Sequence, residues 1–284
     1  MITAFLIFFA LVLEYVYDPV SNMKDTAVIN KYFLKFKDLL KGYKLEKSYV
    51  YLFYPIVIII VFTLLDSFLY YFLHPFFSFL LSLIVLLYCL KPNELNQKLD
   101  VLKFSLESKV EFDNTNRFKY ILYADKSNDL DAIINNIFYS SIRHIFSVLF
   151  TFLLLGPIGC LGYILLDNYI YSDQIKIDQK SKKHVKLIIS LIEYLPIRIC
   201  VFTFAVVANF ELCLDKWRSL RKEKDIYNLN IKLINSVGMA SFKLNDDNDE
   251  TNVSKIIYSQ SMISRSLLAW LSIIGFLIIS GVFI

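Results

Sequence analysis

The feature that most constrains this chain is the clustering of its apolar residues into long runs that are almost free of charge. Between Glu14 and the C-terminus, several runs of 15–24 apolar residues alternate with stretches that are dense in Lys and Asp. Hydrophobic residues make up 56% of the 284 positions and charged residues 20%, against about 45–50% and about 25% in soluble domains. A run of about 20 apolar residues matches the thickness of a bilayer. The sequence therefore predicts an all-α, polytopic helical membrane protein.

Four runs are long enough to cross a bilayer as helices. They are Val50–Leu73, Ile145–Leu166, Leu187–Phe210 and Ser266–Ile284. Two further runs, residues 2–17 and 76–90, are short for a span of about 20 residues, so each either crosses or turns back within the bilayer. We treat residues 1–284 as one membrane-embedded domain with four full-length and two short membrane segments.

The orientation follows from the Lys and Arg residues of the loops, which are more frequent on the cytoplasmic side. With six crossings, the loops at residues 18–49, 91–144 and 211–265 share one side and carry seven, eight and nine basic residues. The other side has none in the His74-Pro75 turn and five in residues 167–186. We therefore expect the three large loops to be cytoplasmic and residues 167–186 to lie outside.

The cytoplasmic regions, about 91–144 and 211–265, are predicted to form a helical cap. An apolar stripe at steps of three and four residues is typical of an amphipathic helix, and it occurs at Leu95, Leu99, Leu102, Leu106 and Val110. Further helices are expected from about Asp129 into the third span, over Leu212–Lys224 and over Tyr227–Phe242. The polar run Asn245–Asn252 has no apolar residue and is predicted to be a flexible tip.

Charged residues inside membrane runs are the first candidates for a functional site, because a charge at membrane depth must be paired or face water. Leu187–Phe210 carries Glu193 and Arg198, which are five positions and hence about 140° apart on a helix. Each is expected to need its own partner on a neighbouring helix, and Pro196 between them is expected to kink the helix. A role in bundle packing and a role in ligand binding both remain open for Arg198.

A polar stripe marks the helix that leads into the third span. It recurs at steps of four and three residues and comprises Asn136, Ser140, Arg143, Ser147 and Thr151. Such a stripe is expected to line a polar cavity, or else to be a solvated helix start with ordinary hydroxyls. Glu14 and Asp66 are carboxylates in other membrane segments and candidate counter-charges for Arg198 or Arg143.

Signatures of soluble enzymes and metal sites are missing. The sequence has no phosphate-binding Gly-rich loop, no H-E-x-x-H and no G-x-S-x-G. Cys89, Cys160, Cys200 and Cys213 lie in or beside apolar runs without C-x-x-C spacing and are interpreted as small buried hydrophobic residues. We expect no cofactor, no metal and, because the net charge of +4 is small and scattered, no nucleic-acid partner.

Three stretches resemble a known family. They are LGPIGCLGY at Leu155–Tyr163, IEYLPIR at Ile192–Arg198, and an N-terminal run that ends in Leu13-Glu14. With these three stretches and its hydrophobic C-terminal tail, the chain resembles AmpE, a family of inner-membrane proteins of Gram-negative bacteria linked to β-lactamase induction. The resemblance implies a multi-pass protein of the bacterial inner membrane with a regulatory role.

The AmpE family is itself similar to the cobalamin-pathway membrane synthase that makes adenosylcobinamide phosphate. That enzyme has an acidic-polar run before its Gly-rich span, where this chain has Asn135-Asn136-Ile-Phe-Tyr-Ser140 without a carboxylate. Asp167 and Asp173 are the carboxylates left to hold a metal against phosphates, and the loop charges place them outside. These departures argue against the enzyme.

The leading hypothesis is a non-enzymatic regulatory or accessory protein of the envelope response to β-lactams. Its partners are expected to be the lipid bilayer and an amphiphilic or cell-wall-derived ligand bound between the spans and read out through the cytoplasmic cap. Two alternatives remain open, a membrane-embedded synthase related to cobalamin biosynthesis and a small permease.

Overall fold

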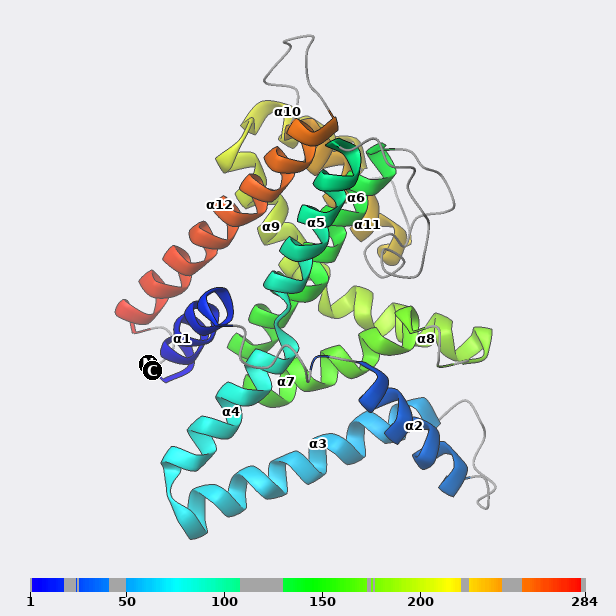
Figure 1. Cartoon of the computed structure of the whole chain (residues 1–284), viewed down its shortest axis with the longest axis vertical. Helices are drawn as coiled ribbons and strands as arrows, with labels where there is room; N and C mark the ends of the chain where they lie inside the picture. The colour runs from blue at the N-terminus through cyan, green and yellow to red at the C-terminus, as the bar shows by residue number, and fades with distance from the viewer. Residues whose placement is uncertain are drawn as a thin grey trace. The chain divides into compact units, whose positions relative to one another are not determined.

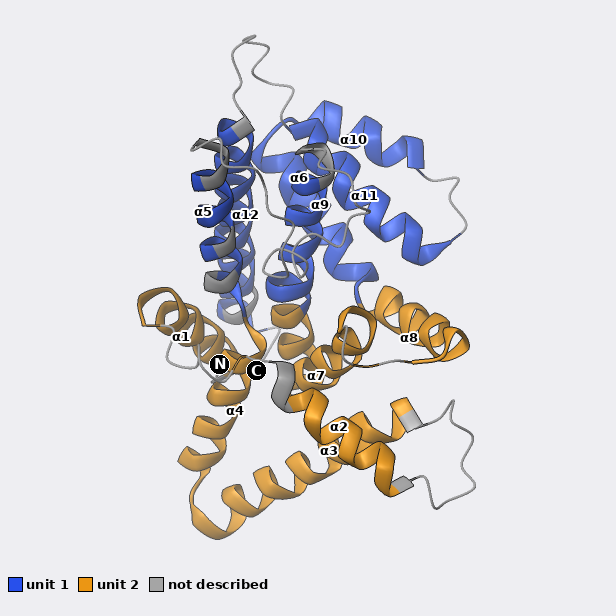
Figure 2. Cartoon of the chain, turned by 45° about the vertical axis from the view of Figure 1, so that its right-hand side comes forward, with its two compact units in different colours: residues 1, 91–147, 193–284 blue, residues 2–90, 148–192 orange. Residues whose placement is uncertain are grey.

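The computed structural model is helical in every element of the part of the chain that it describes (Figure 1). That part comprises residues 2–17, 24, 26–40, 50–107, 130–172, 175, 177–220, 225–241 and 252–281. It divides into two compact units, which Figure 2 shows in different colours. Unit 1 contains residues 91–147 and 193–284, and unit 2 contains residues 2–90 and 148–192. The predicted all-α class is confirmed.

Unit 1 is built around the helix α9. Its elements are α5 (Pro92–Glu107), α6 (Leu130–Ser141), the π-helical turn η3 (Ile142–Phe146), α9 (Tyr194–Val207), α10 (Phe210–Ser219), α11 (Ile226–Ala240) and α12 (Asn252–Ile279). α9 contacts η3, α10, α11 and α12, and α11 also packs against α6. The rings of Phe138 and Phe204, both fully buried, have centroids 5.5 Å apart and close the core between α6 and α9. The helices predicted from about residue 129 and over residues 212–224 and 227–242 are confirmed as α6, α10 and α11.

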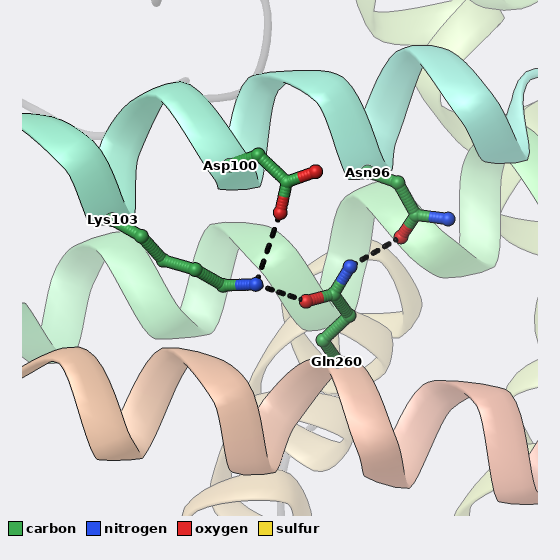
Figure 3. Close-up of polar contacts among 4 residues, drawn as sticks. All are labelled: Asn96, Asp100, Lys103 and Gln260. Atoms are coloured by element: carbon green, nitrogen blue, oxygen red, sulfur yellow. Dashed lines mark hydrogen bonds and ion pairs between the residues drawn. The ribbon is translucent and has the colours of Figure 1, made fainter.

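α5 and α12 are joined by a polar cluster (Figure 3). Lys103 Nζ lies 3.0 Å from Asp100 Oδ1 and donates to Gln260 Oε1 at 2.5 Å, while Gln260 Nε2 donates to Asn96 Oδ1 at 2.9 Å. Both ends of the Gln260 amide are thus bound to α5, which sets the register of α12 against it. Of the predicted apolar stripe, Leu95, Leu99 and Leu102 are buried, and Leu106 and Val110 lie outside the described side chains.

Unit 2 contains the helices of the N-terminal part of the chain and the segment that follows η3. Its elements are α1 (Ile2–Val16), α2 (Thr26–Leu40), α3 (Val50–Phe68), the π-helical turn η2 (Leu69–Leu73), α4 (Pro75–Cys89), α7 (Ser147–Tyr171, from Val148 on) and α8 (Gln179–Ile192). α2 lies in residues 18–49, for which the sequence predicts only a basic loop. Its buried Phe33 packs edge-on against Tyr54 and Tyr169, with ring centroids 5.4 and 5.0 Å away.

α3 and α4 form an apolar hairpin. Residues 51–73 make one helix of 23 residues that is long and apolar enough to cross a membrane, and most of its side chains are exposed. At the turn, His74 Nδ1 accepts a hydrogen bond from the backbone N–H of Phe76. Pro75 is the first residue of α4, a position whose backbone N–H would make no hydrogen bond within the helix, so a proline costs nothing there. Ser78 Oγ donates to Asp66 Oδ1 at 2.6 Å and ties the two helices together. α4 and the apolar part of α1 are shorter than a full span.

The third predicted span is not one straight helix. Residues 133–171 run as a helix of 39 residues, which at 1.5 Å per residue is about 58 Å and nearly twice a hydrocarbon core of about 30 Å. The helix breaks at Gly156, whose φ of 65° is left-handed, directly before Pro157. A Cβ on Gly162 would lie 3.3 Å from Ile59 Cδ1. This Gly-rich stretch therefore bends the helix at Gly156 and allows close packing at Gly162.

The fourth predicted segment, Leu187–Phe210, is also broken. α8 and α9 are bent by 49° and meet at Glu193, so the expected kink is present, three residues before Pro196. Pro196 lies in the first turn of α9, where no helical hydrogen bond is lost, because the break precedes it. At the other end, Asp178 caps α8 by accepting from the hydroxyl and backbone N–H of Ser181, which lowers the pKa of the Asp178 carboxyl.

The described residues contain two helices able to cross a membrane, or three if the bent pair α8–α9 is one span. The prediction of four full-length spans is therefore met only in part. Ser266–Ile284 stays a prediction, because residues 282–284 lie outside the described part. The predicted tip at residues 245–251 lies outside it as well, and Asn252 begins α12.

Hydrogen bonds within unit 2 join its N-terminal helices to the segment around residues 168–184. Asn168 Nδ2 donates to Asn30 Oδ1 at 2.6 Å, and Asn30 Nδ2 donates to Ser172 Oγ at 2.9 Å. Tyr51 OH and His184 Nδ1 lie 3.2 Å apart. These bonds join α2 and the start of α3 to the end of α7 and to α8. The placement of residues 18–49 and 167–186 on opposite sides of the membrane stays a prediction, which the labelling experiment in the Discussion tests.

Candidate functional site

The predicted polar stripe is buried. Ser140, Arg143, Ser147 and Thr151 are 3%, 2%, 0% and 6% exposed, and Asn136 is half-buried. A solvated helix start is therefore excluded for these residues. The stripe passes through η3, whose wider turn changes the direction of the side chains that follow it. Thr151 Oγ1 donates to the carbonyl of Val148 at 3.1 Å, so this hydroxyl bonds to its own helix.

Glu193 is buried at the junction of α8 and α9. The residue is 1% exposed, and its Oε2 accepts a hydrogen bond of 3.1 Å from the hydroxyl of Tyr139, which is 6% exposed. A carboxylate at such a position requires hydrogen bonds to offset its lost hydration. Tyr139 immediately precedes Ser140, so Glu193 is anchored to the same part of α6 as the polar stripe.

Arg198 is held by three contacts in unit 1. Its Nη1 donates to the carbonyl oxygen of Tyr194 at 2.7 Å and to Asn230 Oδ1 at 3.0 Å. The guanidinium carbon lies 3.2 Å from the centroid of the Tyr194 ring, which is a cation–π contact. Arg198 is half-buried and has no carboxylate partner among the described residues. As predicted, Glu193 and Arg198 have separate partners.

Asn230 is the partner that sequence reasoning missed. It is 1% exposed and lies on α11, in line with the buried Leu233, Ile234 and Val237. An Asn on the apolar face of an amphipathic helix is a signal that it has a polar partner, because a buried amide must be hydrogen-bonded. The expected partners of Arg198 were Glu14, Asp66 and the polar stripe, none of which makes a described contact with it.

α11 also packs against α9, so the bond from Arg198 to Asn230 links these two helices of unit 1.

The remaining candidate carboxylates lie in unit 2, each with its own partner. Glu14 is fully buried and forms an ion pair with Lys24, which is 6% exposed. Asp66 is bound by Ser78. Among the candidate charges, Glu193 is thus bonded to Tyr139, Arg198 to Tyr194 and Asn230, Glu14 to Lys24, and Asp66 to Ser78.

No group of three His, Cys, Asp or Glu side chains in the described part of the chain is arranged to hold a metal ion. All four cysteines are buried and free, as the sequence predicts. Asp167 is 5% exposed, and Asp173 lies outside the described residues.

Comparison with known proteins identifies the family. A model of the family described as "Regulatory signalling modulator protein AmpE" matches residues 31–284. The chain belongs to the AmpE family. No curated protein and no solved structure matches it significantly. The match begins within α2, so the whole of α1, with Glu14, lies outside the region that this AmpE family member shares with the family model.

The two internal stretches that resemble AmpE coincide with the two helix breaks. Leu155–Tyr163 contains the left-handed Gly156, and Ile192–Arg198 contains the junction of α8 and α9 together with Glu193 and Arg198. In this AmpE protein the resembling residues are therefore those that interrupt helices in apolar surroundings. Interrupted helices leave backbone groups that need polar partners within the protein.

Proposed function

We propose that this AmpE protein is a non-enzymatic regulatory or accessory protein of the bacterial inner membrane that acts in the envelope response to β-lactams. It binds an amphiphilic or cell-wall-derived ligand among the helices of unit 1. Glu193, Arg198 and the buried residues Ser140 and Arg143 supply the polar contacts. Lipid surrounds the apolar helices, and residues 91–144 and 211–265 are cytoplasmic.

The observation that carries this proposal is the hydrogen bond from Arg198 to Asn230. It connects α9, at the break in an apolar helix pair, to α11, which belongs to the basic and predicted cytoplasmic region. A ligand that competes for the guanidinium changes the bond to α11 directly. A binding event on α9 is in this way transmitted to α11 through one side chain.

The proposal is tested by replacing Arg198. Arg198→Leu removes a charge-assisted hydrogen bond and a cation–π contact, and we expect it to lower the stability of the protein in detergent by about 1–3 kcal/mol. We also expect it to abolish the effect of the protein on β-lactamase induction in cells exposed to a β-lactam. Arg198→Lys should retain only part of the stability and part of the effect on induction, because an ammonium cannot reproduce the planar guanidinium.

Arg218→Leu is the matched control, since Arg218 lies in the same unit, is 63% exposed and is 3.8 Å from Asp215, which is also exposed. This variant should retain stability and induction. Asn230→Leu should reproduce the loss of induction seen with Arg198→Leu. If Arg198→Leu behaves like Arg218→Leu in both assays, the proposal is wrong.

A further inference from the structure

Unit 1 contains a polar cavity that the residues discussed so far do not line. It has a volume of about 330 Å³ and lies among α6, α10 and α11, with a lining of Asn135, Lys216, Asn235, Ser236, Met239 and Ala240. The volume is at the lower end of the range of ligand sites, about 300–1,000 Å³. The cavity therefore suits a small molecule, about the size of one sugar ring.

Two lining residues have side-chain oxygens that accept no hydrogen bond from the described part of the chain. The Oδ1 atoms of Asn135 and Asn235 are buried and have no hydrogen-bond partner among the described residues. Buried amide oxygens in folded proteins are almost always hydrogen-bonded, because an unpaired one has lost its water without replacement. A ligand with N–H or O–H groups supplies the missing donors when these amide side chains turn toward the cavity.

A third residue adds positive charge. Lys216 is exposed, lines the cavity from the last turn of α10, and has no carboxylate partner in the part of the chain that the structure describes. An ammonium group in that position attracts an anion and can hold it with charge-assisted hydrogen bonds. Met239 and Ala240 supply an apolar surface beside these polar groups.

We propose that this cavity binds a small anionic metabolite that carries a carboxylate or phosphate together with several hydroxyl or N–H donors, as sugar acids and sugar phosphates do. Lys216 binds the anionic group, and the oxygens of Asn135 and Asn235 accept from the donors. The inference goes beyond the proposed function, because this cavity shares no residue with the contacts of Glu193 and Arg198. A small solute bound beside α11 would be a second regulatory ligand of the protein.

Calorimetric titration of the purified full-length chain in detergent tests the proposal with three probes. Glucuronate supplies a carboxylate, glucose 6-phosphate supplies a phosphate, and glucose supplies hydroxyls alone. We expect at least one of the two anions to bind about tenfold or more tightly than glucose, because a hydrogen bond to a charged group contributes about that factor. The tighter of the two anions identifies the anionic group. If neither anion binds more tightly than glucose, the proposal is overturned.

Variants of the lining residues test whether the anion binds in this cavity. Lys216→Met should lower the affinity for the anion by about tenfold or more. Lys183 is exposed on α8, and Lys183→Met should bind the anion as tightly as the parent protein does. Asn235→Leu keeps the side-chain size and removes an unpaired acceptor, so it should weaken binding without lowering the melting temperature. Anion binding that survives both Lys216→Met and Asn235→Leu unchanged would overturn the assignment. Since the assay measures binding in purified protein, its failure leaves the Arg198 induction test unaffected.

Discussion

Replacing Gly238 by alanine should strongly destabilise unit 1, whereas the same replacement at Gly275 should not. A Cβ on Gly238 of α11 would lie 2.5 Å from Cδ2 and 2.6 Å from Cε2 of Phe138. That ring is fully buried and packs against Phe204, so it has little space into which to move. Overpacking of this kind costs about 1–3 kcal/mol, a large share of the stability of one domain.

Gly275 is the matched control because a Cβ there meets no atom within 4 Å. Gly275→Ala in α12 should be neutral or stabilising by up to about 1 kcal/mol, through better helix propensity. Thermal unfolding of both variants in the same detergent measures the difference. Gly238→Ala combined with Phe138→Leu should recover part of the loss, and an unchanged melting temperature for Gly238→Ala alone would show that α6 and α11 do not pack as described.

Cysteines introduced at Lys35 and Lys183 should be labelled from the same side of the membrane. Both lysines are exposed, on α2 and α8, and the bonds of Asn30 to Asn168 and Ser172 hold α2 close to the end of α7. A side chain cannot form such bonds across a bilayer of about 30 Å. The expected result is all-or-none, since a reagent that does not cross the membrane either reaches both positions or neither.

The four native cysteines give this labelling experiment a low background, because all are buried. A membrane-permeant thiol reagent serves as the control that both new cysteines are reactive. Labelling of Lys35→Cys and Lys183→Cys from opposite sides would support the loop orientation predicted from the charges and would show that the contacts of Asn30 do not form in the membrane.

The amino-acid sequence by itself determined the helical class and the main apolar segments. A long apolar run requires backbone hydrogen bonds within the segment, so residues 51–73 could be predicted as a membrane helix without any knowledge of their neighbours. The stripe of Leu95, Leu99 and Leu102 likewise depends only on the period of a helix. The family could also be recognised from short stretches, since these depend only on the order of residues.

The partners of the polar residues were decided by the tertiary structure. Periodicity shows which face of a helix is buried but not which other helix covers it, so Asn230 could not be chosen over Glu14 or Asp66 as the partner of Arg198. The side of the membrane on which residues 167–186 lie stays a prediction for a related reason. Counting loop charges assumes that each apolar run crosses once as a straight helix, whereas the breaks at Gly156 and Glu193 redirect the chain within such runs. Where a broken helix goes next depends on the packing around it, and packing is a property of the folded chain.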